Sequence, residues 1–309
     1  MKRTLVSLVF SLHLISLAVA GVKTDLQEDG LRGSVQTVRI ETAQFASRAG
    51  HWMEGPRGPS LTTTYDIHGN RIERVTSDSK MLYTYNAQGN LSAIVTYDPN
   101  RSLCQFGYPC DARGRKLETR LLYDSQGRKL ETRSLYFDGT PDQKIVYVYD
   151  DKGHLLEEAT SDPGGLIGKM VYTYDGEEHL IKEDVYGPSG GVKIELFHTY
   201  DEYGRRIATT TSDAHDAALG IEKTVETYDG QGNVLEITTY YTERAVDEEG
   251  NTIPPPAKFI YTYEWDTHSN WIKQFQFLCT AQKESIKPVC EPYMVTYRTI
   301  TYYNDAKVP

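Results

Sequence analysis

Hydrophobic and polar residues alternate with a period of two over most of the chain, which is typical of β-strands with two different faces. One face of the expected strands is aliphatic and collects Val146, Val148, Leu156, Val171, Thr173, Ile181, Phe197, Thr199, Ile207, Val225, Thr227, Leu235 and Ile237. The other face is rich in tyrosine and collects Tyr147, Tyr149, Leu155, Tyr172, Tyr174, Leu180, Tyr263, Trp265 and Trp271, mixed with Arg71, Lys116, Lys129 and Arg206. We expect the aliphatic face to form the core, although a register shift of one residue would exchange the two faces.

The strands are punctuated by a recurring motif: Tyr, then Asp or Asn, two variable residues, Gly, and finally Asn, Arg or His. Copies begin at Tyr65, Tyr85, Tyr123, Tyr149, Tyr200 and Tyr228, and imperfect copies begin at Cys110, Tyr174 and Trp265. Asp or Asn favours the first position of a type I turn, and Gly three residues later adopts the positive φ that closes a hairpin with a bulge. Each copy therefore predicts a β-hairpin in which the motif Tyr lies opposite the second residue after Gly.

Two copies lack the glycine, since Glu178 and Ser269 occupy its position. A non-glycine residue in the left-handed region costs about 1 kcal/mol. We therefore expect these two turns to be reshaped, and Gly176 offers the first of them another route.

The hairpins predict an all-β protein: an elongated, twisted antiparallel sheet that curls over its aliphatic face toward a partly open barrel. Less regular segments surround the array, namely a strand at 34–40, a Gly/Pro-rich loop at 50–59 and a Pro-rich connection with Pro254-Pro255-Pro256. The expected organisation is a signal peptide (1–20), an N-terminal strand and loop (21–60), the hairpin array (61–244), the connection (245–258) and C-terminal strands that complete the same array (259–309).

The first twenty residues have the pattern of a secretory signal peptide: Lys2 and Arg3, an apolar run, and Ala18-Val19-Ala20 before Gly21. We therefore expect an exported protein, periplasmic or extracellular, with no transmembrane anchor after cleavage. Export also permits disulfides. The chain has Cys104, Cys110, Cys279 and Cys290, which allow three connectivities. We favour the local pairs Cys104–Cys110 and Cys279–Cys290, because each would close a loop between neighbouring strands.

Composition excludes several classes of protein. The chain has 33 Lys and Arg against 43 Asp and Glu, a net charge of −10, which disfavours nucleic acid as a partner. The chain contains no C-x-x-C pair, which would suggest a zinc or redox site, and we expect no cofactor. Tyrosine is in excess, with 23 Tyr against 8 Phe and 3 Trp, and it is the residue that the motif repeats.

The repeated Tyr-Asp-x-x-Gly-Asn/Arg runs resemble those of YD-repeat (RHS-repeat) proteins of bacteria. Asp29-Gly30-Leu31-Arg32-Gly33-Ser34-Val35, Asn270-Trp271-Ile272-Lys273 and the segment 295–303 resemble the two ends of small secreted members, so the likeness covers residues 21–303. In large relatives, such hairpins coil into a hollow shell around a toxic domain. This chain has no extra domain to serve as cargo and too few repeats for a large shell. The resemblance therefore implies a fold but does not indicate an activity.

The tyrosine-rich face supplies the candidate ligand-binding residues: Tyr147, Tyr149, Tyr172, Tyr174, Tyr263, Trp265 and Trp271. Exposed rings on a sheet can stack on sugars, while the alternative is that they pack across strands. The repeated motif aspartates are spaced too widely for a Ca²⁺ shell and are expected to cap turns. His68, His154, His179 and His268 also lie in turns, where solvent exposure is expected.

We therefore expect a non-enzymatic exported binding or scaffold protein, whose ligand is a carbohydrate or another component of the cell envelope. The alternatives are an enzyme acting on envelope polysaccharide and a shell-like interaction module for a protein partner. A deep pocket with two close carboxylates would favour the enzyme.

Overall fold

The structure, a computed structural model, describes residues 24–99, 110–111, 114–213, 221–241, 257–280 and 289–303. The described residues form one short helix and nineteen strands: α1 (Asp25–Glu28), β1 (Val35–Arg48), β2 (His51–Glu54), β3 (Leu61–Tyr65), β4 (Arg71–Val75), β5 (Lys80–Tyr85), β6 (Leu91–Tyr97), β7 (Arg115–Tyr123), β8 (Lys129–Tyr136), β9 (Pro141–Tyr149), β10 (Leu155–Asp162), β11 (Gly165–Tyr174), β12 (Leu180–Tyr186), β13 (Val192–Tyr200), β14 (Arg206–Asp213), β15 (Ile221–Tyr228), β16 (Val234–Tyr241), β17 (Ala257–Trp265), β18 (Trp271–Thr280) and β19 (Val289–Tyr302). The expected signal peptide (1–20), Cys104 and residues 245–256 of the expected connection lie outside the described residues.

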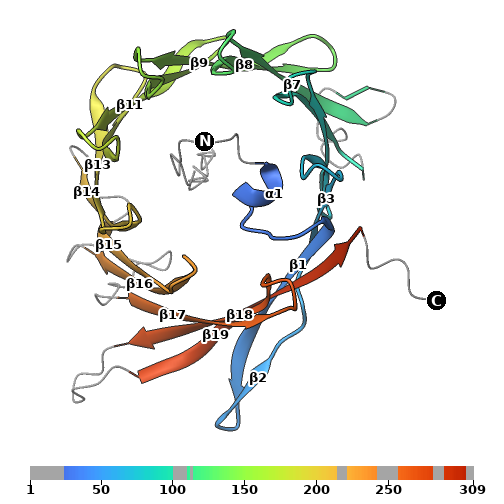
Figure 1. Cartoon of the computed structure of the whole chain (residues 1–309), viewed down its shortest axis with the longest axis vertical. Helices are drawn as coiled ribbons and strands as arrows, with labels where there is room; N and C mark the ends of the chain where they lie inside the picture. The colour runs from blue at the N-terminus through green and yellow to red at the C-terminus, as the bar shows by residue number, and fades with distance from the viewer. Residues whose placement is uncertain are drawn as a thin grey trace, which may run out of the picture.

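The strands close into a barrel (Figure 1). From β3 to β19 each strand pairs antiparallel with the next, and β1 closes the ring by pairing with β3 on one edge and β19 on the other. The ring has 18 strands, because β2 pairs only with the outer end of β1 and extends that strand as a hairpin beyond the ring. The all-β fold curled into a barrel is confirmed, and the barrel is closed. Residues 50–59, expected to form a loop, contain β2.

The motif turns have the predicted geometry. In the turn after β9, the Asp150 carboxylate accepts hydrogen bonds from the backbone N–H groups of Lys152 and His154, at 2.9 and 2.8 Å. Gly153 has a φ of 96°, and Tyr149 lies opposite Leu155, the second residue after Gly. Motif turns of this kind span 66–70, 86–90, 124–128, 150–154, 175–179, 201–205, 229–233 and 266–270. These eight turns connect alternate strand pairs of an antiparallel meander, so they lie on one rim of the barrel. Asp111 and Arg115, from the imperfect copy that begins at Cys110, make the same turn hydrogen bonds between β6 and β7, at the other rim.

The expectation of reshaped turns at Glu178 and Ser269 is wrong. Both residues adopt the left-handed conformation of the glycine they replace, with φ values of 69° and 61°. The turn hydrogen bonds are also kept, since Asp175 N–H donates to the His179 carbonyl at 2.9 Å. The bonds accepted by the capping carboxylate therefore hold the turn in shape against the local strain.

Motif residues of several turns also tie their hairpin to a neighbour. At Arg128, His154, His179 and Arg205 the side chain after the glycine position bonds to the Asp of its own turn and lies against the motif Tyr of the next hairpin. Thus His154 Nδ1 lies 2.8 Å from an Asp150 oxygen, and its ring stacks on Tyr174 with centroids 4.8 Å apart. The Tyr174 hydroxyl donates in turn to the Leu155 carbonyl at 3.0 Å. The same hydroxyl-to-carbonyl bond joins Tyr85 to Arg71, Tyr123 to Leu91, Tyr200 to Leu180 and Tyr228 to Arg206.

The tyrosine face lines the inside of the barrel, which corrects the expectation that the sheet curls over its aliphatic face. Tyr65 and Tyr85 bond to residues of the α1 segment, which lies inside the ring (Figure 1). On β9, Val146 and Val148 are 37% and 47% exposed, whereas Tyr147 between them is half-buried. The period of two shows which residues share a face of the sheet, but it does not show which face lies inside the barrel. The aliphatic face also carries ion pairs such as Lys169–Glu157, at 3.0 Å, that suit a surface in contact with water.

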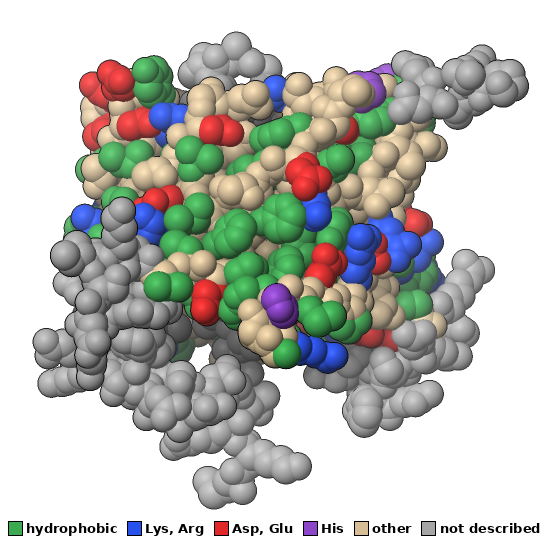
Figure 2. Space-filling model, turned by 90° about the horizontal axis from the view of Figure 1, so that it is seen from below, with side chains coloured by type: hydrophobic (Ala, Val, Ile, Leu, Met, Phe, Trp, Pro, Cys, Tyr) green, Lys and Arg blue, Asp and Glu red, His purple; other side chains and the backbone are tan. Residues whose placement is uncertain are grey.

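The outer surface over the strands at the bottom of Figure 1 is seen directly in Figure 2. Hydrophobic side chains gather in the centre of this face, and acidic and basic side chains lie around them. The disulfide Cys279–Cys290 joins β18 to β19, where the two cysteines are directly opposite in register. This local pair confirms the favoured pairing, while the pair Cys104–Cys110 involves a residue outside the described ranges. No helix in the described part of the chain is long and apolar enough to cross a membrane.

Residues 24–34, which we call the plug, enter the barrel ahead of β1. A capping box starts α1: the Thr24 hydroxyl accepts from Gln27 N–H, and the Gln27 side chain accepts from Thr24 N–H. Leu26 and Leu31 of the plug are buried against the wall of the barrel. The cluster that they form is completed by Val35, Val38, Tyr65 and Tyr302, with Ile40 and Ile300 at its edge. The hydrophobic core thus lies between the plug and strands β1, β3 and β19.

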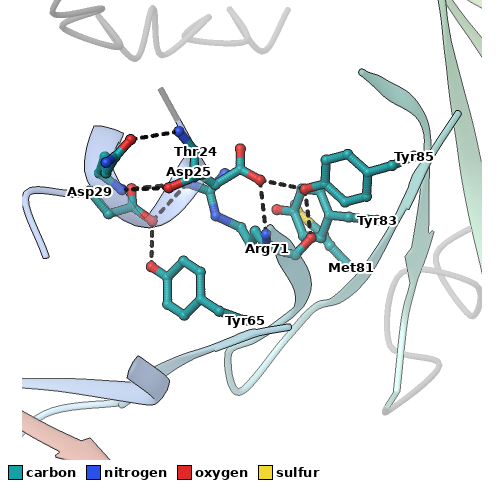
Figure 3. A network of polar contacts seen from close by, with 9 residues as sticks. Thr24, Asp25, Asp29, Tyr65, Arg71, Met81, Tyr83 and Tyr85 are labelled. Carbon is teal, nitrogen blue, oxygen red and sulfur yellow. Dashed lines mark hydrogen bonds and ion pairs between the residues drawn. The ribbon is translucent and has the colours of Figure 1, made fainter. Parts of the chain in front are cut away.

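Acidic side chains also anchor the plug, as Figure 3 shows. Asp29 accepts from Arg71 at 2.8 Å and from the Tyr65 hydroxyl, and Asp25 accepts from the Tyr85 hydroxyl at 2.5 Å. Burial, together with the bond to Asp29, raises the pKa of Tyr65 well above its usual value. Arg71 carries the charge that balances these carboxylates inside the barrel.

Candidate functional site

The structure divides the seven aromatic candidates into two groups. Tyr147 and Tyr149 lie on β9, and Tyr172 and Tyr174 lie on β11, with β10 between them. The second group, Tyr263, Trp265 and Trp271, lies on the β17–β18 hairpin. Both groups face the interior, but their surroundings differ.

The first group is occupied by contacts within the wall. Tyr147 lies 3.2 Å from the Thr132 hydroxyl and beneath the Lys129 ammonium, and Tyr149 lies beneath the Arg128 guanidinium. Tyr172 is only 6% exposed. Burial raises the pKa of Tyr149 and of Tyr174 to about 12. These four rings therefore pack between hairpins, in line with the packing alternative.

The second group keeps an accessible ring. Tyr263 is the centre of this aromatic cluster, with ring centroids 5.6 Å from Trp265 and 6.1 Å from Trp271. Its hydroxyl donates to the Val234 carbonyl at 2.6 Å and accepts from the Gln274 amide at 3.1 Å, which fixes the ring. Trp265 is 38% exposed. The cluster thus has a rigid base and one indole in contact with solvent.

Trp265 lines a cavity of about 1010 Å³ at the rim that carries the motif turns. The plug forms one wall of this cavity, and the turns at 66–69 and 231–233 form others. Polar side chains around it are Gln231 and Asn233, with His68 and Arg32 at other points of the lining. The Asn233 amide nitrogen donates to both Asp229 oxygens, at 3.1 and 2.9 Å, which holds that side chain in place. The cavity therefore combines an aromatic surface with amide groups.

Asp66 is the acidic residue of this cavity lining, and its carboxylate is already engaged. It accepts from the N–H groups of His68 and Asn70 and from the Asn70 amide, at 2.8 to 2.9 Å. Burial opposes ionisation, but these hydrogen bonds keep the pKa of Asp66 below its usual value. The carboxylate thus caps its turn in the ionised form, in which it has no proton to donate.

The turn histidines also have partners inside the fold. The His179 ring stacks on Tyr200 with centroids 4.7 Å apart, and His268 stacks on Tyr302 at 4.0 Å. His68 is exposed at the cavity. In the described part of the chain, no group of three or more His, Cys, Asp or Glu side chains could hold a metal ion.

The cavity itself was not foreseen from the sequence. Its lining comes from residues 24–35, 66–69, 231–233 and the β17–β18 hairpin, which are far apart along the chain. The Thr24-x-x-Gln27 capping box was a readable signal for a helix start ahead of β1, but nothing in it places that helix inside a barrel.

Comparison with known proteins gives similarities among solved structures. No family model matches the chain, and no curated protein matches it. A porin-like protein from Bacteroides uniformis is 10% identical, with 87% of this chain and 99% of that chain covered and a TM-score of 0.44. A chain of the TcdB2-TccC3-Cdc42 complex is 13% identical, with 76% of this chain and 17% of that chain covered and a TM-score of 0.30. Similarities of this extent do not show what the protein binds.

Proposed function

We propose that this chain is an exported, non-enzymatic binding protein of the YD-repeat (RHS-repeat) type, and that its rim cavity takes a saccharide of the cell envelope. The hairpins with capped Asp-x-x-Gly turns support the repeat assignment. The Cys279–Cys290 disulfide suits an oxidising compartment, in keeping with the expected signal peptide.

The observation that carries the proposal is the half-exposed indole of Trp265 at the wall of the cavity. An indole ring presents a flat apolar surface that packs against the C–H face of a sugar. The amides of Gln231 and Asn233 supply donors and acceptors that can bond to hydroxyl groups. A cavity of about 1010 Å³ is at the upper end of the range for small-molecule sites, which suits a short oligosaccharide.

The cavity also favours binding over hydrolysis. Glycosidases use two carboxyl groups about 5 to 10 Å apart, one of which must be free to donate a proton. Asp66 is the acidic residue of the lining, and it is committed to its turn. The described residues that line the cavity therefore do not provide the pair of carboxyl groups that the enzyme alternative requires.

The test is a glycan array with the full chain, followed by titration of the retained glycans with tryptophan fluorescence as the signal. Trp265→Ala should weaken binding by about 5- to 140-fold, because stacking on an aromatic ring contributes on the order of 1–3 kcal/mol. Trp52→Ala is the matched control: Trp52 lies on β2 outside the ring and is 41% exposed, close to the 38% of Trp265. Retention of no glycan by the wild-type chain, or an equal loss in both variants, would contradict the proposal.

A further inference from the structure

Arg298 lies on the inner wall of the barrel next to the aromatic cluster. On β19 it is two residues from Ile300, which packs against the plug cluster, so both side chains are on the inner face. Its guanidinium carbon is 3.5 Å from the centroid of the Trp271 ring. Trp271 contacts Tyr263, and Tyr263 contacts Trp265 at the cavity, so a continuous row of rings leads from the cavity to Arg298.

The guanidinium is incompletely paired. Its Nε and Nη1 atoms are buried and have no hydrogen-bond partner among the described residues. By contrast, Arg71 on the inner wall pairs with Asp29 at 2.8 Å, and Arg205 at the rim pairs with Asp201 at 2.7 Å. Burial lowers the pKa of Arg298 to about 10, so the side chain stays charged at neutral pH. A buried charge of this kind is stabilised by an anion that reaches it.

The described groups near Arg298 do not supply that anion. Asp29 is the acidic residue that acts on Arg298 from a distance, and it is already bonded to Arg71 and Tyr65. Tyr65 and Tyr263, which also act on Arg298 electrostatically, are neutral phenols at physiological pH. Since the whole chain carries a charge of −10, an anion would be drawn here by this local site and not by the overall field.

We propose that Arg298, stacked on Trp271, is an anion subsite that accepts the carboxylate of an acidic saccharide bound in the barrel interior. The subsite rests on the proposed function and narrows it to sugars of the uronic acid type. Stacking on the indole fixes the plane of the guanidinium, and its N–H groups lie in that plane in the fork that matches a carboxylate. The sugar ring of such a ligand would continue along the row formed by Trp271, Tyr263 and Trp265.

The experiment compares two probes of equal length and ring geometry: tetragalacturonate and its methyl ester, which lacks the negative charges. The wild-type chain should bind the acid at least about tenfold more tightly than the ester, as expected for a charge-assisted pair. Arg298→Gln should abolish this preference, and Arg298→Lys should keep part of it, because Lys retains the charge but not the fork. Arg39→Gln is the matched control, since Arg39 lies on neighbouring β1 with its side chain 53% exposed and paired with Glu41 on the outer face.

Thermal unfolding of each variant separates binding from folding. Arg298→Gln removes a buried charge with unpaired donors, so its midpoint should equal or exceed that of the wild-type chain. Equal affinity of the wild-type chain for the acid and the ester, failure to bind either, or a preference that survives in Arg298→Gln would overturn the subsite. Where neutral glycans still bind and depend on Trp265, the proposed function stands without the subsite; where no glycan binds at all, both fail.

Discussion

Replacing Asn270 should release the plug from the barrel. Asn270 follows Ser269 in the last motif turn and is only 1% exposed. Its side chain accepts from the Arg32 N–H at 2.7 Å, and it donates to the Arg32 carbonyl at 2.8 Å and to the Tyr302 hydroxyl at 2.7 Å. Through these bonds one amide holds both backbone groups of a plug residue and the final tyrosine of β19.

The magnitude follows from those three bonds. Each contributes about 0.5–1.5 kcal/mol net, and burial of the polar groups left behind adds to the loss. Solvent can reach Arg32, which limits that second part. Asn270→Ala should therefore lower the free energy of unfolding by about 3 kcal/mol. Hydrogen exchange of the plug amides should accelerate as well, because Leu26 and Leu31 would lose the contacts that keep them buried.

The matched control is Asn90→Ala. Asn90 has the same position in the turn at 86–90, but none of the hydrogen bonds among the described residues uses its side chain. Its backbone N–H donates to the Asn86 side chain, and its carbonyl accepts from the Asn86 N–H. Its replacement should cost less than about 1 kcal/mol. Urea unfolding, followed by circular dichroism and tryptophan fluorescence, measures both variants. Equal losses in the two would show that Asn270 does not anchor the plug and would refute the reasoning.

Two further predictions concern the repeat itself. Glu178→Gly should stabilise the protein by up to about 1 kcal/mol and Gly89→Glu should destabilise it by a similar amount, because both positions have positive φ values, 69° and 83°; urea midpoints that move the opposite way would contradict this. Burial raises the pKa of Tyr149, Tyr174 and Tyr261 to about 12 in the folded chain, whereas in the unfolded chain tyrosine loses its proton at about pH 10. The contribution of these three residues to the free energy of unfolding should therefore be complete below about pH 10 and should be lost as the pH rises towards 12. Tyrosinate absorbance at 295 nm and circular dichroism should then change together; ionisation of all tyrosines at about pH 10 in a folded chain would contradict the prediction.

The hairpins could be predicted because their determinants are local. The Asp150 carboxylate bonds to backbone groups two and four residues ahead, and the glycine conformation is required within the same turn. These contacts set the register, which places Tyr149 opposite Leu155 as expected. The all-β fold follows from repeating that unit, since each strand is joined to the next by a short connection.

The inside of the barrel could not be assigned from alternation alone. Val171 suggested a core face, but Lys169 lies on the same face two residues away and pairs with Glu157 at the surface. Charged residues between the aliphatic ones were the signal that this face is solvated. The opposite face is polar at its tyrosine hydroxyls, which are satisfied by carbonyl groups of neighbouring hairpins, such as that of Leu155. An interior lined by half-buried tyrosine is possible because barrels of 16 to 18 strands enclose more space than side chains fill.

The candidate site lies where the hairpins depart from the repeated motif. In the β17–β18 hairpin, Trp265 replaces the motif Tyr and lines the cavity, while Ser269 replaces Gly at a φ of 61°. Asn270 in the same turn turns away from its usual partner, the Asp of its own turn, and bonds instead to the plug. Across the cavity, position 69 retains the motif glycine, and the plug adds a second reason for it. A Cβ there would lie 3.0 Å from the Thr24 hydroxyl, and the Gly69 carbonyl accepts from Leu26 N–H. The regular copies thus build the wall of the barrel, and the copies that contact the plug shape the cavity that we propose as the binding site.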